Sequence, residues 1–256
     1  MSNFIIRLIS SVILIALIFL AFNIGEFTIL LFCGLTVFLL FLEVNNATLN
    51  SKNKIFYLGT PFFGILSPFF IEKIVIFSII LLIILLFNIS FRVQRFLRIF
   101  SHFYILLSLY LFINIICNFS GTINLKQPLY LLSLVIASDV GGYLIGKSVG
   151  KYKISPKTSP NKTFEGAFGG ILMCILVWSL FFRGFAESLI IEITTVVFIS
   201  LCAQLGDFLV SFAKRSLAIK DSSNFIPGHG GVFDRMDSII GGIFGYSLII
   251  YLGYGL

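Results

Sequence analysis

The polar stretch from Ser211 to Asp237 interrupts a strongly apolar sequence and holds side chains that suit phosphate chemistry. Its carboxylates are oxygen ligands of the kind that Mg²⁺ takes together with substrate phosphates, and they are Asp221, Asp234 and Asp237. Its cations can neutralise a polyphosphate, with Arg also able to hold two oxygens at once, and they are Lys214, Arg215, Lys220 and Arg235. The stretch therefore predicts a site at which a metal ion and several cations hold phosphate groups.

The spacing of Asp234 and Asp237 favours a shared role. They stand three residues apart at the start of the last apolar run, which places both carboxylates on one face of a helix. A metal site is one use of such a pair. The alternative is that both carboxylates cap the helix and offset its dipole while the neighbouring cations meet anionic lipid headgroups.

Glycine and histidine between these charges suggest close contact with a ligand. Gly228, Gly230 and Gly231 allow positive φ angles and a close approach of the backbone, so that their N–H groups can face anionic oxygen. His229 lies among them, where it could donate to phosphate or act as an acid or base.

A second group of polar residues lies earlier in the chain. Asp139 falls inside an apolar run, where an ionisable side chain is costly and hence a candidate for function. Gly142, Gly146 and Gly150 follow at four-residue spacing, which predicts a face for close helix packing rather than a ligand site.

The loop after that run offers hydroxyls and a cation beside the start of the next helix, a place where phosphate can also meet free backbone N–H groups. Its candidate binding residues are Ser159, Pro160, Lys162 and Thr163. Further on, Asp207 lies four residues before Ser211 and so on the same helical face. Asp207 either extends the metal site or has a hydrogen-bonded structural role.

The elements that must position these residues are membrane helices. The chain has 256 residues, of which 58% are hydrophobic and only 11% charged, whereas a soluble domain carries about 25% charged residues. Apolar runs long enough to span a membrane lie near 4–22, 27–44, 55–71, 74–91, 103–119, 129–150, 166–182, 189–213 and 236–255. We expect an all-α bundle of about nine transmembrane helices, forming one integral membrane domain over 1–256, with scaffold spans in 1–128 and a catalytic half in 129–256.

The cations predict the orientation of these helices. With the N-terminus in the cytoplasm, all of the 18 Lys and Arg except Lys73, Lys126 and Arg183 fall on the cytoplasmic side, as the positive-inside rule requires. Both polar loops then face the cytoplasm. This alternating distribution argues against a nucleic-acid partner. Glu43 ends the second apolar run on the same side and is not assigned to the site.

These residues resemble a known signature, that of the phosphatidate cytidylyltransferases, or CDP-diacylglycerol synthases. Their pattern S-x-x-K-R-x4-K-D, then P-x-H-G-G-x-x-D-R-x-D after a short spacer, matches this chain from Ser211 to Asp221 and from Pro227 to Asp237. An upstream pattern, D-x-x-A-Y, G-K and S-P-x-K-T-x-E-G, is similar to the segments from Asp139 and from Ser159, with Gly142 where the family usually has Ala. The resemblance covers roughly the C-terminal half.

The resemblance implies a reaction in which the phosphate of phosphatidate attacks the α-phosphorus of CTP and pyrophosphate leaves. It implies Mg²⁺ or another divalent cation, with a second metal ion left open, held by Asp221, Asp234 and Asp237 together with Asp139 and Asp207. Catalytic roles would fall to Lys214, Arg215, Lys220, His229 and Arg235. Substrates would be bound by Ser159, Pro160, Lys162, Thr163, Ser211, Gly230 and Gly231.

The resemblance also implies a bacterial inner-membrane protein that meets CTP on the cytoplasmic side and phosphatidate within the lipid, with a homodimer left open. A CDP-alcohol phosphotransferase would have paired D-x-x-D elements in a D-G-x-x-A-R context, of which only the pair at Asp234 and Asp237 is present. An ion-coupled transporter would use Asp139 and Asp207 as a relay but leave the Ser211–Asp237 pattern unexplained.

Overall fold

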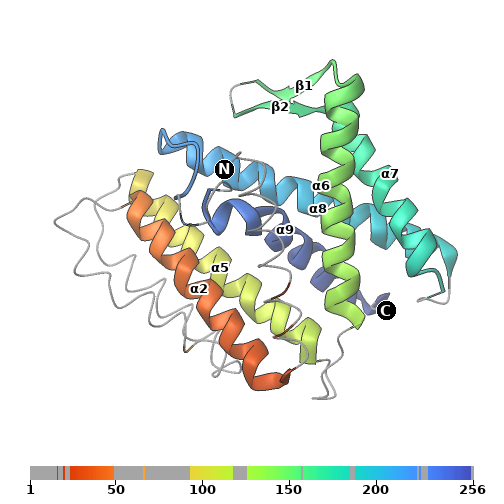
Figure 1. The fold of residues 1–256 in the computed structure, drawn as a ribbon, viewed down its shortest axis with the longest axis horizontal. Helices are drawn as coiled ribbons and strands as arrows, with labels where there is room; N and C mark the ends of the chain where they lie inside the picture. The colour runs from red at the N-terminus through yellow and green to blue at the C-terminus, as the bar shows by residue number, and fades with distance from the viewer. Residues whose placement is uncertain are drawn as a thin grey trace. The chain divides into compact units, whose positions relative to one another are not determined.

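The computed structural model describes residues 16, 20, 24–48, 66, 93–117, 126–156, 158–184, 188–223, 225 and 230–254. These residues are mainly helical, as expected (Figure 1). The helices are α2 (Glu26–Thr48), α5 (Val93–Cys117), α6 (Lys126–Val149), α7 (Phe164–Phe181), α8 (Leu189–Ser216) and α9 (Phe233–Ile249), and a π-helical turn (Ile250–Tyr254) follows α9. The all-α prediction missed one antiparallel hairpin, of β1 (Lys153–Ser155) and β2 (Ser159–Thr163).

Among the residues that the structure describes, six helices are long and apolar enough to cross a membrane. They correspond to the predicted runs 27–44, 103–119, 129–150, 166–182, 189–213 and 236–255. The runs 4–22, 55–71 and 74–91 lie almost entirely outside the described residues, so the total of nine spans stays a prediction. The helix predicted from residue 103 begins earlier, at Val93, because its first turns carry charges that the apolar pattern excluded.

The chain divides into two compact units. The first holds Met1–Ile113 and Ser216–Arg235, and the second holds Asn114–Arg215 and Met236–Leu256. The long polar stretch is thus shared: its central part belongs to the first unit and both of its ends belong to the second. The prediction of a single membrane domain stays a prediction.

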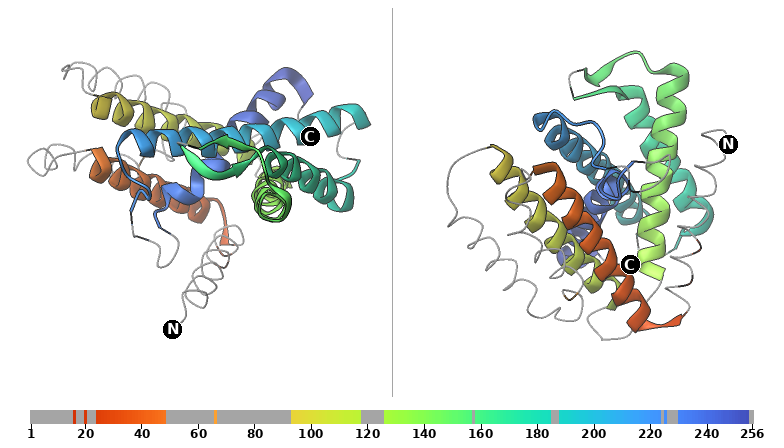
Figure 2. Two further views of the ribbon diagram at one scale, coloured as in Figure 1. Left: turned by 90° about the horizontal axis from the view of Figure 1, so that it is seen from above. Right: turned by 60° about the vertical axis from the view of Figure 1, so that its left-hand side comes forward.

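In the first unit, α2 and α5 lie side by side (Figures 1 and 2). One face of α2 is buried at helical spacing, and the ring of Phe41 on this face lies 4.3 Å from the ring of His102 on α5. Arg98 is also buried, and its Nε donates to Thr48 Oγ1 over 2.8 Å while Nη2 donates to the Thr48 carbonyl over 2.7 Å. Arg98 therefore satisfies the C-terminal end of α2, and it does so from within α5, ahead of the helix start predicted at residue 103.

In the second unit, glycines bring α6 and α7 into close contact. A Cβ atom on Gly146 would lie 3.2 Å from Thr163 Oγ1, and one on Gly166 would lie 2.8 Å from the carbonyl oxygen of Gly142. A Cβ on Gly150 would lie 2.6 Å from Thr163 Oγ1. The predicted packing role of the glycines at four-residue spacing is confirmed.

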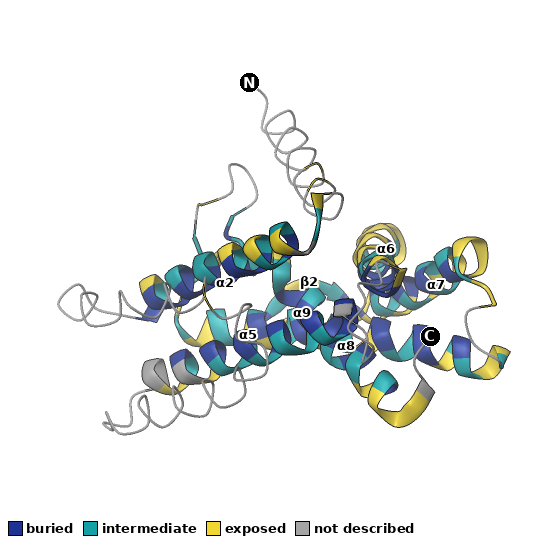
Figure 3. Cartoon of the chain, turned by 90° about the horizontal axis from the view of Figure 1, so that it is seen from below, coloured by how far each residue is buried: buried dark blue, intermediate teal, exposed yellow. Residues whose placement is uncertain are grey.

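Buried and exposed positions both occur along α7 (Figure 3), and an exposed apolar residue recurs at every fourth position, here named the stripe. Its members are Phe164, Phe168, Leu172, Leu176 and Leu180. Because water would penalise so large an apolar surface, this stripe is typical of a helix face in contact with lipid.

Glycines also join α8 to α9. A Cβ on Gly206 would lie 2.6 Å from the Asp237 carbonyl oxygen and 2.7 Å from Gly241 Cα. The two backbones therefore touch at the level of Asp207 and Asp237, and this contact brings those two aspartates into the same part of the unit.

The hairpin leads directly into α7. Lys153 pairs with Thr163 and Ser155 pairs with Ser159. Thr163 ends β2 and is also the N-cap of α7, where its side-chain oxygen accepts a hydrogen bond of 3.1 Å from Gly166 N. Such a cap satisfies one of the N–H groups that a helix start leaves unpaired.

Candidate active site

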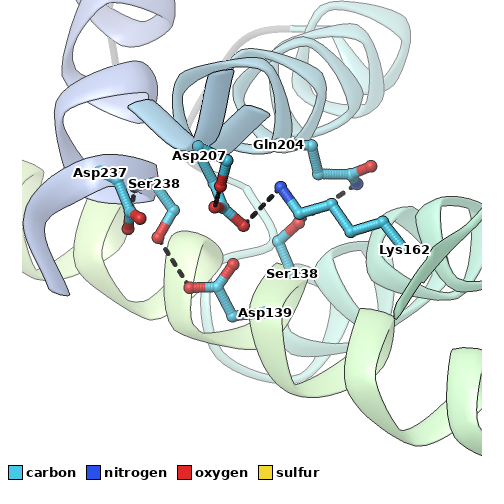
Figure 4. A network of polar contacts seen from close by, with 8 residues as sticks. Ser138, Asp139, Lys162, Gln204, Asp207, Asp237 and Ser238 are labelled. Carbon is cyan, nitrogen blue, oxygen red and sulfur yellow. Dashed lines mark hydrogen bonds and ion pairs between the residues drawn. The ribbon is translucent and has the colours of Figure 1, made fainter. Parts of the chain in front are cut away.

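Three carboxylates from different helices extend toward the same part of the second unit (Figure 4). They are Asp139 on α6, Asp207 on α8 and Asp237 on α9. Asp237 is buried, and the carboxylates of Asp207 and Asp139 and the ammonium group of Lys214 are near enough to act on it electrostatically. Within this unit the structure thus brings together residues that lie far apart in the sequence.

Ser238 orients Asp139. Its hydroxyl donates to Asp139 Oδ2 over 2.7 Å, from the residue next to Asp237 on α9. The backbone N–H of Ser238 donates to Asp237 Oδ1 over 2.9 Å. One serine therefore contacts two of the three carboxylates, which keeps α6 and α9 in register at this level.

Asp207 has two partners among the predicted site residues. Lys162 Nζ, on β2, lies 2.7 Å from Asp207 Oδ2, and Ser211 Oγ donates to Asp207 Oδ1 over 3.3 Å. The contact with Ser211 confirms that the two residues share a helical face. Lys162, predicted to bind a substrate phosphate, forms an ion pair with a carboxylate in this structure.

Arg215 forms a second link between α8 and the hairpin. Its Nε donates to the Thr158 carbonyl over 3.1 Å, and Ser155 Oγ donates to Thr158 Oγ1 over 3.0 Å. This bond and the ion pair between Lys162 and Asp207 together hold the hairpin against the C-terminal part of α8. Pro160 in the same hairpin is exposed, and Ser159 is half-buried.

A polar cluster that the sequence did not reveal joins α6, α7 and α8 beside the carboxylates. Ser138 and Ser200 are buried with their hydroxyls 2.9 Å apart, and Gln204 Nε2 donates to Ser138 Oγ, to Ser200 Oγ and to the Ala167 carbonyl. Buried polar groups need such partners, because an unpaired one costs about 1–3 kcal/mol. The sequence offered one sign of this cluster: Gln204 is a polar residue within an apolar run, three residues before Asp207.

In the first unit, Asp234 holds a turn of the polar stretch together. Its Oδ2 accepts hydrogen bonds of 2.9 Å from Ser222 N and 2.9 Å from Gly231 N. The carboxylate of a residue in the first turn of α9 thus reaches back to the N–H three residues earlier, just before the helix begins. This observation supports the capping alternative for Asp234.

Gly230 has the positive φ predicted for this segment, at 86°. A Cβ there would lie 2.9 Å from Asp234 Oδ2, so the turn needs glycine for both its backbone angle and its space. Lys220, Asp221 and Arg235, in the same unit, are exposed. His229, Pro227 and Gly228 lie outside the described residues, so their predicted roles stay predictions.

The carboxylates also bear on the predicted metal ion. Among the residues that the structure describes, no three Asp, Glu, His or Cys side chains are close enough together to hold one ion. Mg²⁺ is commonly held by one or two carboxylates, with water and substrate phosphates supplying the other ligands. The oxygen donors of Asp139, Asp207 and Asp237, taken one or two at a time, fit that mode.

Two residues of importance were not predicted. Ser238 follows Asp237 directly, so its place beside the carboxylates could have been read from the helical pattern. Glu43, which was left out of the site, accepts hydrogen bonds from the polar stretch within the first unit. Nothing in the linear sequence links it to a loop nearly 180 residues away.

Comparison with known proteins yields a consistent set of relatives. The model of a cytidylyltransferase family matches residues 5–252. A phosphatidate cytidylyltransferase of Staphylococcus aureus (strain COL) is 41% identical over 119 residues, 46% of each chain, and one of Staphylococcus haemolyticus is 39% identical over 119 residues, also 46% of each. The chain therefore spans about half the length of the curated relatives that it matches.

Proposed function

This chain belongs to the cytidylyltransferase family, and from that premise we propose that it transfers the cytidylyl group of CTP to phosphatidate. The products are CDP-diacylglycerol and pyrophosphate. The observation that carries this proposal is the meeting of Asp139, Asp207 and Asp237, from three helices long enough to cross a membrane, beside the cation of Lys162. The relatives that bear the name phosphatidate cytidylyltransferase support the same substrates.

In this reaction a phosphate oxygen of phosphatidate forms a bond to the α-phosphorus of CTP. The bond from that phosphorus to the oxygen that links it to the β-phosphorus breaks. The leaving group is pyrophosphate. Since the attacking oxygen belongs to the substrate, the protein needs no nucleophile of its own. Its task is to hold two anions in line and to neutralise the charge between them.

The cations serve this neutralisation. Lys214 already acts on Asp237, and Arg215 lies at the end of α8 beside the hairpin. Lys220 and Arg235 are exposed, and their roles in holding phosphate stay predictions from the resemblance. Arg suits the role because its planar group can donate two hydrogen bonds to one phosphate.

A divalent cation, Mg²⁺ in the first instance, completes the proposal. One or two of the carboxylates of Asp139, Asp207 and Asp237 would hold it in the second unit, with water and substrate oxygens as the remaining ligands. When bound, such an ion draws charge from the phosphate oxygens and favours departure of pyrophosphate. The metal-binding roles of Asp221 and Asp234 and the presence of a second ion stay predictions from the resemblance.

We further propose a cytoplasmic N-terminus, nine spans and a site that faces the cytoplasm of a bacterial cell. The distribution of Lys and Arg supports this orientation. CTP then arrives from the water, and phosphatidate arrives from the lipid that the exposed stripe on α7 would contact. Nothing described favours a CDP-alcohol phosphotransferase or a transporter over this reaction.

The test is an assay of the purified protein in mixed micelles with phosphatidate, Mg²⁺ and CTP labelled on its α-phosphate. Label should appear in the lipid fraction, one pyrophosphate should form for each labelled lipid, and chelation of Mg²⁺ should stop both. Asp237→Asn should lose the activity. Label in lipid without phosphatidate, or equal turnover by Asp237→Asn, would contradict the reaction or its site.

A further inference from the structure

A buried carboxylate in the first unit has no part in the chemistry described above. Glu43 lies in α2, among apolar residues, with 2% of its surface exposed. A charged side chain in a membrane-spanning helix is costly unless it is paired or hydrogen-bonded. Its partners therefore indicate what it is for.

All of the hydrogen bonds of this carboxylate that the structure describes go to the polar stretch of the same unit. Oε1 accepts from Ser223 Oγ over 2.6 Å and from Val232 N over 2.7 Å. Oε2 accepts from Ser222 Oγ over 2.9 Å and from Phe233 N over 2.8 Å. An ionised carboxylate has about four acceptor positions, so these four donors match its capacity.

The four donors come from two separate places along the chain. Ser222 and Ser223 stand at one end of a loop, and Val232 and Phe233 stand at its other end, where α9 begins. The carboxylate therefore joins the two ends of the segment 222–233, here named the anchored loop, and fills N–H groups that a helix start leaves unpaired.

Gly231 makes room for this contact. A Cβ atom at Gly231 would collide with Ser222 Oγ and would lie 2.7 Å from Glu43 Oε2. Gly231 was predicted to bring the backbone close to phosphate. The structure gives it a second role, since only glycine leaves room for Glu43 at this position.

We propose that Glu43 is a positioning residue for the reaction, acting by holding Ser222 and Ser223, at one end of the anchored loop, and Val232 and Phe233, at its other end. Asp221 and Asp234 border this loop, so the anchor fixes their separation within the first unit. This inference rests on the proposed function, and it gives the N-terminal half a part in catalysis in addition to its role as a scaffold.

The first experiment compares Glu43→Gln with Glu192→Gln. Glu192 is a matched control, because it is also a helical carboxylate with 2% exposure and its Oε2 accepts from a backbone N–H, that of Gly184, over 3.3 Å. In Glu43→Gln one carboxylate oxygen is replaced by an NH₂ group, which cannot accept the hydrogen bonds that this oxygen accepts in the wild type. We expect kcat to fall about 30-fold or more with less than about a threefold change in KM for CTP, since the loop acts on developing charge. Glu192→Gln should keep kcat within about twofold.

A second readout does not depend on activity. Hydrogen exchange of the full protein in micelles should show faster exchange in peptides covering 222–233 of Glu43→Gln, with the rest of the chain unchanged. If the wild type makes no labelled lipid but this local change appears, the proposed function fails while the anchor stands. If exchange is unchanged, or if kcat is unchanged, the anchor proposal is wrong.

Two further variants separate positioning from folding. The double variant Ser222→Ala/Ser223→Ala removes two donors and leaves the buried carboxylate in place, and it should lower kcat in the same direction by a smaller factor. Glu43→Asp keeps the charge on a shorter side chain and should recover part of the kcat lost in Glu43→Gln. Loss of activity in proportion to loss of folded protein in all of these variants, with Glu192→Gln equally impaired, would overturn the proposal.

Discussion

Lys162 and Asp207 form an ion pair between the hairpin and α8, with 2.7 Å between Nζ and Oδ2. Their side chains are 27% and 30% exposed, so the pair contributes no more than about 1 kcal/mol to stability. Its importance lies in electrostatics, because Asp207 also acts on the buried carboxylate of Asp237. A cation at this point offsets the repulsion between two carboxylates.

Replacement of this cation should therefore affect turnover far more than folding. In Lys162→Met we expect activity to fall about 100-fold, as for loss of one preorganised charge in a site, while stability changes by less than about 1 kcal/mol. Lipid labelling and thermal unfolding in micelles measure the two effects. Lys153→Met, an exposed lysine of the same hairpin, is the control, and an equal loss there would indicate a general charge effect.

Ser238→Ala should weaken the carboxylate group without disturbing α9. Loss of a hydrogen bond to a charged group costs about 1.5–3 kcal/mol, so we expect at least about a tenfold loss of kcat/KM and a higher Mg²⁺ concentration at half-maximal activity. The comparison is Ser247→Ala on the same helix, whose hydroxyl has no hydrogen-bond partner among the described residues. Equal behaviour of the two variants would remove Ser238 from the site.

Two glycine substitutions should differ in sign. A methyl group on Gly206 would meet the Asp237 carbonyl at 2.6 Å, and Gly206→Ala should cost about 1–3 kcal/mol and displace the carboxylates. A methyl group on Gly142 would meet nothing nearer than 3.5 Å, and Gly142→Ala should be neutral or gain up to about 1 kcal/mol. Unfolding and activity measured together test both, and a stable, active Gly206→Ala would disprove the close contact of α8 and α9.

Thr163 should behave as a helix cap. Thr163→Ala is expected to lower stability by about 0.5–2 kcal/mol, whereas Thr163→Ser keeps the oxygen that accepts from Gly166 N and should stay within about 0.5 kcal/mol of the wild type. If Thr163→Ser instead raises KM for CTP several-fold at unchanged stability, the residue contacts substrate, as the sequence predicted.

The apolar runs predicted the helices well where the signal was long and uniform. The pattern placed the start of α5 ten residues too late, because Arg98 interrupts the apolar run although its guanidinium is hydrogen-bonded by the end of α2. The hairpin was missed because strands as short as Lys153–Ser155 have no measurable period. Both errors concern polar residues whose partners are distant in the sequence.

The candidate site was predicted in composition more than in arrangement. Asp207 and Ser211 follow from helical spacing alone, and their contact is present. The pairing of Lys162 with Asp207 and the contacts of Glu43 depend on how helices pack, which a single sequence does not specify. The capping bonds of Asp234 show that one residue can match a functional pattern and also have a structural use.

The junction of β2 and α7 has a mechanical consequence. The strand ends at Thr163 and the helix begins at Phe164, so no loop residue separates the strand that carries Lys162 from α7. The position of the Lys162 backbone therefore depends on how α7 packs against the glycines of α6. Substitutions in the contact between α6 and α7, even several turns from Lys162, would tilt α7 and so move this cation.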